Sequence, residues 1–305
     1  MTGSGLARAL GVAMLGLVLA GCQAHVQRGT HRTQIDSHAG QFVFEHDEVD
    51  HPSREKVARA IDKASPELAR WGGLREPVHV YILPSHQALE DAVQRPDYDW
   101  LRAWAKYDQI FLQSPRTWSV LGASQSDVDE LVLHELTHIV MYQQAANRTH
   151  WSRKGIPLWF REGMASFTAN QGYRWPSLED LARFLHRNPD THPIANPEPL
   201  YRGESAIVYG AAHHAFAFLV RRYGEDEVRE ILRAMREEEL DFRGAFEQTT
   251  GVTHDAFVED FTRYVRLRGF RGGRLRMHRA SPVEVKPKGP AVPRVQPESS
   301  PAPER

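Results

Sequence analysis

The sequence predicts an α+β fold, in which a small mixed sheet with helices is followed by a mainly helical part. Runs of β-prone residues occur only before residue 113, where they alternate with segments of helical periodicity. Beyond that point helical periodicity continues alone. Apolar residues make up 41% of the chain and charged residues 25%, as in an ordinary globular protein that buries its own core.

Residues 41–270 are predicted to form one domain, with an α/β part at 41–145 and a helical part at 146–270. In chain order, the first part is expected to contain a strand at 41–45, a helix at 51–71, a strand at 78–83, a helix at 85–94, a strand at 110–112 and a helix at 127–144. The state of residues 100–107 stays open.

The second part is expected to contain helices beginning at 157 and covering 178–186, 205–223, 225–238 and 256–267. Residues 171–200 are rich in proline and asparagine, and are expected to form one wall of a cleft.

Residues 134–138 contain two histidines four residues apart, with a glutamate after the first. On a helix His134 and His138 would share one face, with Cβ atoms about 5–6 Å apart, and both imidazoles could reach one Zn²⁺. Glu135 would lie where it could take a proton from an activated water. The pattern alone also fits two histidines on a helix that is merely packed in the core.

The flanks of this pattern favour a buried helix. Ser126 and Asp129 are predicted to form its capping box, and Asp127 adds negative charge at the positive end of the helix dipole. Apolar residues lie nearly all round the helix, as expected in the middle of a domain.

Glu162 is the candidate third ligand, because a catalytic zinc site has three protein ligands and one open position. It lies on the next predicted helix, which Pro157 is suited to begin. Gly163 would let the two helices approach closely. The segment around Glu162 is too apolar for an ordinary solvated carboxylate.

The pattern H-E-x-x-H at 134–138, followed by W-x-x-E-G-x-A at 159–165, resembles the gluzincin branch of zinc metallopeptidases, the peptidase MA-like group. The resemblance covers about residues 81–261. It implies a zincin-like fold with the zinc site in the cleft between the two parts. In that family one sheet edge faces the cleft and pairs with the substrate backbone, but the sequence does not indicate which strand this would be.

By this resemblance His134, His138 and Glu162 are the zinc ligands, and Glu135 is the general base of peptide-bond hydrolysis. Gluzincins often stabilise the oxyanion with a tyrosine from a later helix, which makes Tyr209 the candidate. His213, one turn further on, is the alternative, and ordinary helix packing explains either residue equally simply.

Residues 1–21 are predicted to be a lipoprotein signal peptide. Arg8 precedes an apolar run at 9–20 that is short for a membrane span and typical of a secretory signal. The run ends in Leu-Ala-Gly-Cys, which resembles the bacterial lipobox, so Cys22, the only cysteine of the chain, is expected to carry the lipid. Gln23 in place of aspartate favours the outer membrane, facing the periplasm.

Two segments are expected to lie outside the domain. Residues 22–40 are polar and predicted to be a flexible tether. Residues 271–305 are rich in proline, arginine and lysine, and are predicted to be a disordered tail.

The expected function is a membrane-anchored zinc metallopeptidase that hydrolyses peptide or protein substrates in the bacterial envelope. A net charge of −1 gives no indication of nucleic acid as a partner. Two alternatives stay open: an envelope lipoprotein that keeps zinc without catalysis, and a hydrolase of a non-peptide amide such as a cell-wall crosslink.

Overall fold

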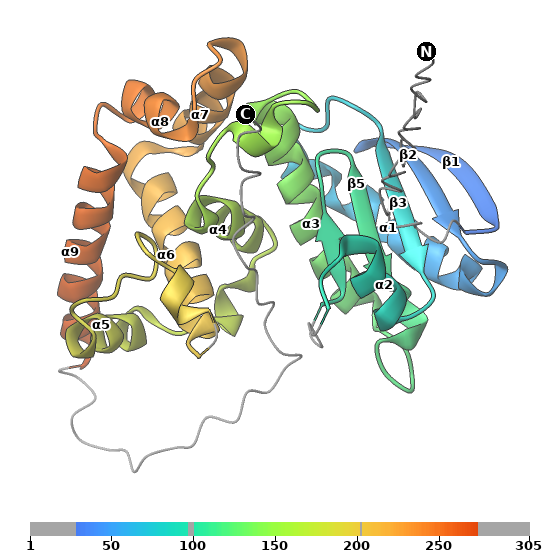
Figure 1. Cartoon of the computed structure of the whole chain (residues 1–305), viewed down its shortest axis with the longest axis horizontal. Coiled ribbons are helices and arrows are strands. Elements are labelled where there is room, and N and C mark those ends of the chain that lie inside the picture. The colour runs from blue at the N-terminus through green and yellow to red at the C-terminus, as the bar shows by residue number, and fades with distance from the viewer. Residues whose placement is uncertain (1–28, 97–100, 202, 274–305) are drawn as a thin grey trace, which may run out of the picture.

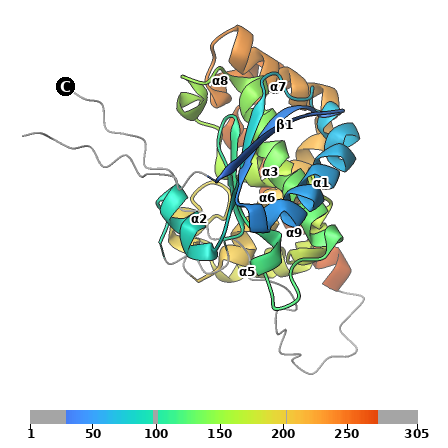
Figure 2. The same ribbon diagram turned by 90° about the vertical axis from the view of Figure 1, so that its right-hand side faces the viewer.

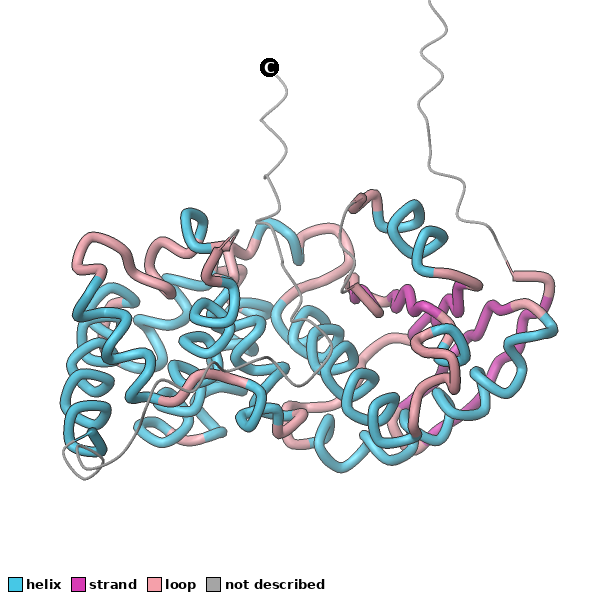
Figure 3. The backbone as a smooth tube through the Cα atoms, turned by 90° about the horizontal axis from the view of Figure 1, so that it is seen from below, coloured by secondary structure: helices cyan, strands magenta, loops and turns pink. Residues whose placement is uncertain are grey.

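The structure, a computed structural model, describes residues 29–96, 101–201 and 203–273. The strands lie together in one half of the molecule, and the other half consists of helices and loops (Figure 1, Figure 3). This mixed architecture, with a small sheet followed by a helical part, confirms the prediction at the level of α and β content.

The five-stranded sheet of the described residues is mixed. It contains β1 (His31–Ser37), β2 (Gly40–His46), β3 (Val78–Leu83), β4 (Ala103–Ala105) and β5 (Gln109–Gln113). The strand order is β1-β2-β3-β5-β4. The pairs β2–β3 and β3–β5 are parallel, whereas β1 and β4 are antiparallel edge strands.

Side chains alternate between the two faces of the sheet, as the pleat of a strand requires. On β3, Val78, Val80 and Ile82 belong to the main core, whereas Leu83 belongs to a smaller cluster with Leu89 of α2. Figure 2 shows α2 on one side of the strands and α1 and α3 on the other. The first part contains the helices α1 (His51–Ala69), α2 (His86–Val93) and α3 (Gln125–Ala145), with short 3₁₀ turns η1 (Glu48–Asp50) and η2 (Pro115–Thr117).

The second part packs against α3 through two of its helices. It contains α4 (Leu158–Thr168), α5 (Leu178–Arg187), α6 (Ser205–Tyr223), α7 (Glu225–Glu237), α8 (Phe242–Thr250) and α9 (His254–Gly273), with the 3₁₀ turns η3 (Trp151–Arg153), η4 (Gln171–Arg174) and η5 (Glu198–Leu200). Both α4 and α7 contact α3. The helix that carries the two histidines therefore lies between the sheet and the helical half (Figure 1).

The prediction of a flexible tether at 22–40 is wrong for the second half of this segment. Residues 31–37 form β1, which pairs along its whole length with β2. The strand escaped prediction because its residues are exposed or only half-buried, and polar side chains on a solvated edge leave no apolar pattern. The folded part therefore begins before residue 41.

The cap of α3 also differs from the prediction. Ser124, not Ser126, is the N-cap, and it forms a capping box with Asp127. Asp129 instead accepts hydrogen bonds from Lys63 and Gln125. Two overlapping Ser-x-x-Asp patterns occur here, and the helix begins at the earlier one, so α3 starts two residues before the predicted position.

The C-terminal helices extend the prediction. The helix α8 was not predicted, and α9 continues to Gly273, so the segment at 271–273 belongs to a helix rather than to the predicted tail. The predicted signal peptide, Cys22, the start of the tether and the rest of the tail lie outside the described residues. No helix in the described ranges has both the length and the apolar composition needed to cross a membrane.

Candidate metal centre

His134, His138 and Glu162 converge, as the sequence predicts. His134 and His138 lie one turn apart on α3, and Glu162 reaches them from α4. The two Nε2 atoms are 3.2 Å apart. Glu162 places one oxygen 3.6 Å from His134 Nε2 and the other 3.8 Å from His138 Nε2.

These distances match the chemistry of a metal ligand set. Zinc binds histidine nitrogen and carboxylate oxygen at 2.0–2.2 Å, so two ligand atoms of a regular tetrahedron lie about 3.3–3.6 Å apart. All three observed separations are within about half an ångström of that value. Glu162 and His138 are also almost completely buried, at 7% and 8% exposure, although neither has an apolar role. This buried group can hold a metal ion.

Gln171 supports His134 from behind. Its Oε1 lies 2.9 Å from His134 Nδ1, so the amide can accept the Nδ1 proton and leave Nε2 free to bind a metal. Gln171 opens η4, which is fixed to α3 by a second contact. Glu130, one turn before His134, accepts a hydrogen bond from Tyr173 and pairs with Arg174.

His138 is oriented in a different way. Its Nδ1 is buried and has no hydrogen-bond partner among the described residues. The ring instead stacks on Tyr142, one turn further along α3, with centroids 6.2 Å apart and planes 15° apart. Tyr142 in turn contacts Trp151. Aromatic packing therefore fixes the second histidine, whereas a hydrogen bond fixes the first.

The charges of the site stabilise an ionised Glu162. Burial alone raises the pKa of this carboxyl group, but His138, His134 and Arg161 outweigh burial and lower the pKa to about 2. Burial lowers the pKa of His138 to about 3. Burial also lowers the pKa of His134, but the carboxylates of Glu162 and Glu135 raise it more. An anionic glutamate and a neutral histidine are the forms that bind metals.

Glu135 does not belong to this converging group. It is 8% exposed, and burial raises its pKa to about 7. The backbone of Ala105 on β4 hydrogen-bonds to its carboxylate. The opposite edge of β4 faces β5. The residues that flank β4 bond to β5 there, through Lys106 N–H to Gln109 O and through Gln113 N–H to Arg102 O. No other described strand pairs with β4, so its second edge is free in this part of the chain and faces Glu135.

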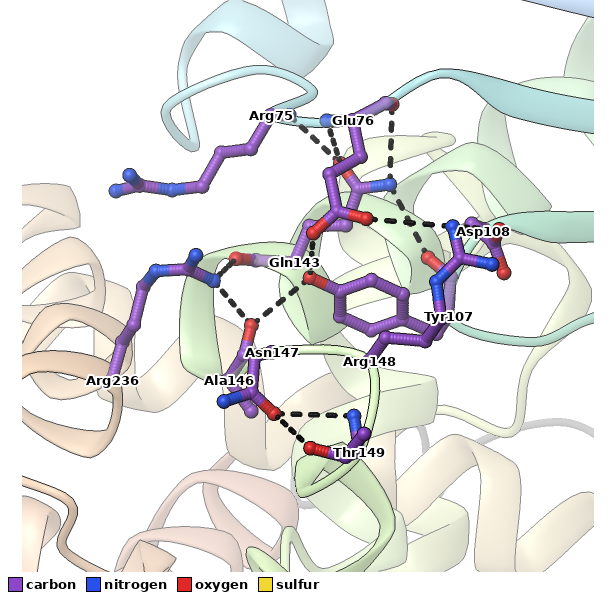
Figure 4. A network of polar contacts seen from close by, with 10 residues as sticks. All are labelled: Arg75, Glu76, Tyr107, Asp108, Gln143, Ala146, Asn147, Arg148, Thr149 and Arg236. Atoms are coloured by element: carbon purple, nitrogen blue, oxygen red, sulfur yellow. Dashed lines mark hydrogen bonds and ion pairs between the residues drawn. The ribbon is translucent and has the colours of Figure 1, made fainter.

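Figure 4 shows how the far end of α3 is fixed between the two halves of the molecule. Arg236 of α7 donates to the carbonyls of Gln143 and Ala146. The Gln143 side chain accepts from the backbone N–H groups of Arg75 and Glu76, at 2.7 and 3.0 Å. The helix that carries the histidines is therefore bonded to both halves, and its position is well defined.

The predicted close approach at Gly163 occurs, but with a different helix. A Cβ atom on Gly163 would lie 2.4 Å from Ala212 O and 2.7 Å from Phe216 Cβ, both on α6. The prediction that this glycine brings α4 against α3 is therefore wrong. Gly163 sets the depth at which α4, and with it Glu162, rests on α6.

Tyr209 and His213 both lie on α6, as predicted. Tyr209 is buried and stacks on Trp175, with ring centroids 5.5 Å apart. His213 Nδ1 lies 3.0 Å from the Oγ of Ser166 on α4. A Cβ atom on Gly172 would lie 2.7 Å from His213 Nε2, so the ring also supports η4. The proposed part of either residue in catalysis stays a prediction.

Three residues near the site were not predicted. Gln171 and Tyr201 lie in connecting segments, where no periodic pattern indicates which way a side chain points. Tyr201 is 5% exposed. Burial raises the pKa of its hydroxyl group, and the charge of Glu162 adds a smaller increase. Arg161, next to Glu162, acts on the pKa of both Glu162 and His138. Its helical position was predicted, but its influence on the ligands was not.

Comparison of the sequence with protein-family models gave no match, and comparison with curated proteins found none similar enough to indicate a relationship.

Proposed function

We propose that this protein is a zinc-dependent metallopeptidase of the gluzincin type. The observation that supports this most strongly is the convergence of two imidazoles and a carboxylate at tetrahedral ligand spacing, beside a separate buried glutamate. Three protein ligands are the number found in catalytic zinc sites, whereas structural sites use four. A bound zinc ion would polarise the scissile carbonyl and activate a water.

In this proposal Glu135 is the general base and acid. Its pKa of about 7 lies near neutral pH, where a proton-transfer group works best. The carboxylate takes a proton from the attacking water and gives it to the leaving amine. Glu162 cannot act as the proton-transfer group, because its pKa of about 2 keeps it ionised.

The free edge of β4 is the proposed binding surface for the substrate backbone. An extended peptide can add to an open sheet edge through main-chain hydrogen bonds. Ala105 at this edge hydrogen-bonds to Glu135, so a peptide paired with β4 would lie next to the base. Tyr209 remains the first candidate for oxyanion stabilisation. Tyr201 is a second, because the charges of Glu162 and Arg161 act on it.

The proposed location is the bacterial envelope, with the chain held to the outer membrane by a lipid on Cys22 and facing the periplasm. This part rests on the lipobox-like sequence that ends in Cys22.

The test of this function is the substitution Glu135→Gln, assayed on an unstructured protein substrate. The variant should bind zinc like the wild type and lose hydrolysis by about 10²–10⁴-fold, the usual contribution of a general acid–base group. Wild-type turnover in the variant would contradict the role of Glu135. A zinc-loaded wild type that hydrolyses neither peptides nor other amides would favour the alternative of a non-catalytic zinc lipoprotein.

A further inference from the structure

The loop between η2 and α3 displays two aliphatic side chains that no described residue covers. Val120 and Leu121 are 103% and 96% exposed, more than any other large hydrophobic residue in the described ranges. Single exposed aliphatic residues are common on protein surfaces, but two adjacent, fully exposed ones at the tip of a loop are less so.

Hydrogen bonds fix the conformation of this loop. Ser119 Oγ donates to the carbonyl of Gly122 at 2.7 Å, and Gly122 has the positive φ of 74° that such a tight turn requires. At the base, Ala123 N–H donates to Pro115 O at 2.8 Å, and Trp118 Nε1 donates to Gln113 O at 2.9 Å. The turn therefore holds its two aliphatic residues outward.

The described chain begins at the same end of the molecule. Thr30 N–H donates to Asp47, and the neighbouring η1 carries Val49, which is 59% exposed. Buried Asp50 then joins η1 to the loop, because it accepts hydrogen bonds from Arg116 and Ser114, both at 2.6 Å. Val49, Val120 and Leu121 thus share one end of the sheet with the point where the chain enters the fold.

The segment between Cys22 and Thr30 is short. Only residues 23–29 separate Thr30 from Cys22, so even a fully extended chain would hold Thr30 within about 29 Å of that cysteine. A lipid on Cys22 would therefore keep this end of the molecule next to the bilayer.

We propose that Val120 and Leu121 insert into the membrane that holds the lipid anchor, as a second and non-covalent contact with the bilayer. This inference rests on the lipid anchor proposed above. The contact is apolar, because the two side chains that make it are those of a valine and a leucine. Insertion should therefore depend little on salt, unlike attraction to anionic headgroups.

The contact would fix the height of the metal centre above the bilayer. The helix α3 begins directly after the loop, and His134 lies about 15 Å along it from Ser124. The proposed peptidase would then act on protein segments near the membrane surface.

The test uses the single cysteine of the chain. In the lipidated full-length protein Cys22 is acylated, so Leu121→Cys introduces the only free thiol. An environment-sensitive fluorophore is attached there, and the protein is placed in phosphatidylethanolamine–phosphatidylglycerol vesicles that contain nitroxide-labelled lipid. The matched control is Leu267→Cys, at a 57% exposed leucine on α9, a helix in the half of the molecule without the sheet (Figure 1).

The fluorophore at position 121 should be blue-shifted and quenched by the nitroxide lipid, at low and high salt alike, whereas that at 267 should not. Equal, water-like emission at both positions would overturn the membrane contact. Reaction of the wild-type chain with the fluorophore would show that Cys22 is not acylated, and would overturn the anchor on which the contact rests. That second failure would leave the proposed peptidase activity unaffected.

Discussion

At the scale of single residues, the site depends on how each ligand is held. Glu162 is ionised by its neighbours, His138 is oriented by aromatic stacking, and His134 is oriented by the amide of Gln171. A partner on the far nitrogen of a ligating histidine fixes both its tautomer and its ring orientation. The two histidines of one helical turn are thus supported by different means.

Gln171→Leu should weaken zinc binding by about 10–100-fold, the usual effect of removing such a partner. The leucine fills similar space but cannot accept the Nδ1 proton of His134. Gln171→Glu keeps an acceptor and serves as the matched control, which should bind zinc like the wild type. The measurement is a zinc titration against a competing chelator. Unchanged affinity in the leucine variant would show that Gln171 does not support the site.

The sequence predicted that His134, His138 and Glu162 lie together, but not that Gln171 lies behind them. Helical spacing places His134 and His138 on one face from local geometry alone. Gln171 instead reaches His134 from a short 3₁₀ turn, and its direction depends on contacts of η4 with α3 and α6. Such long-range contacts leave no periodic trace in a sequence.

At the scale of elements, the packing of α4 on α6 controls where Glu162 lies. Gly163→Ala would place a methyl group 2.4 Å from a backbone oxygen of α6, so the two helices would have to separate. We expect a loss of about 1–3 kcal/mol in unfolding free energy, as for other overpacked cores, together with weaker zinc binding.

Gly203→Ala is the control for this prediction, since a Cβ there would meet no atom within 4 Å. Urea unfolding and the zinc titration measure the two effects. A Gly163→Ala protein as stable as the wild type would show that the α4–α6 contact tolerates a side chain, contrary to this account.

The two edge strands that the sequence missed share a physical cause. The strand β1 is solvated, and β4 has only three residues whose extended state depends on pairing with β5. By contrast, β3 and α6 have the predicted limits, because strong apolar patterns and clear end signals define them. Tertiary pairing, rather than local preference, decides the edges of this sheet.

At the scale of the whole molecule, several buried or half-buried histidines oppose folding in acid. Burial lowers the pKa of His192, His213, His214 and His254, and it is the largest cause for each. In the unfolded chain these groups titrate near 6.5. Below that pH the unfolded state binds more protons than the folded state, so this part of the stability is present above about pH 6.5 and is lost as the pH falls.

His254 offers a clean test because it lies outside the metal centre. Its Nε2 accepts a hydrogen bond from Trp159 Nε1 at 2.9 Å, and the residue is 7% exposed. His254→Gln can still accept this bond but does not titrate. The variant should be less stable than the wild type at pH 7.5, and the difference should shrink by pH 5.

The shrinkage should be about 1.4 kcal/mol for each pKa unit by which folding lowers the histidine pKa, within the range scanned. The measurement is urea unfolding of both proteins with the metal removed. Titration of the residues at the candidate metal centre then contributes equally to the stability of both proteins, so it cancels in the difference between them. A stability difference that stays constant or widens toward pH 5 would contradict the lowered pKa of His254.

The central claim is that His134, His138 and Glu162 together bind one zinc ion. The most direct measurement is the zinc content of the purified wild-type protein, compared with that of Glu162→Ala. We predict one zinc ion per wild-type chain, and its loss in a variant that remains folded. A folded wild type that binds no zinc when zinc is supplied, or a variant that binds it equally well, would contradict the claim.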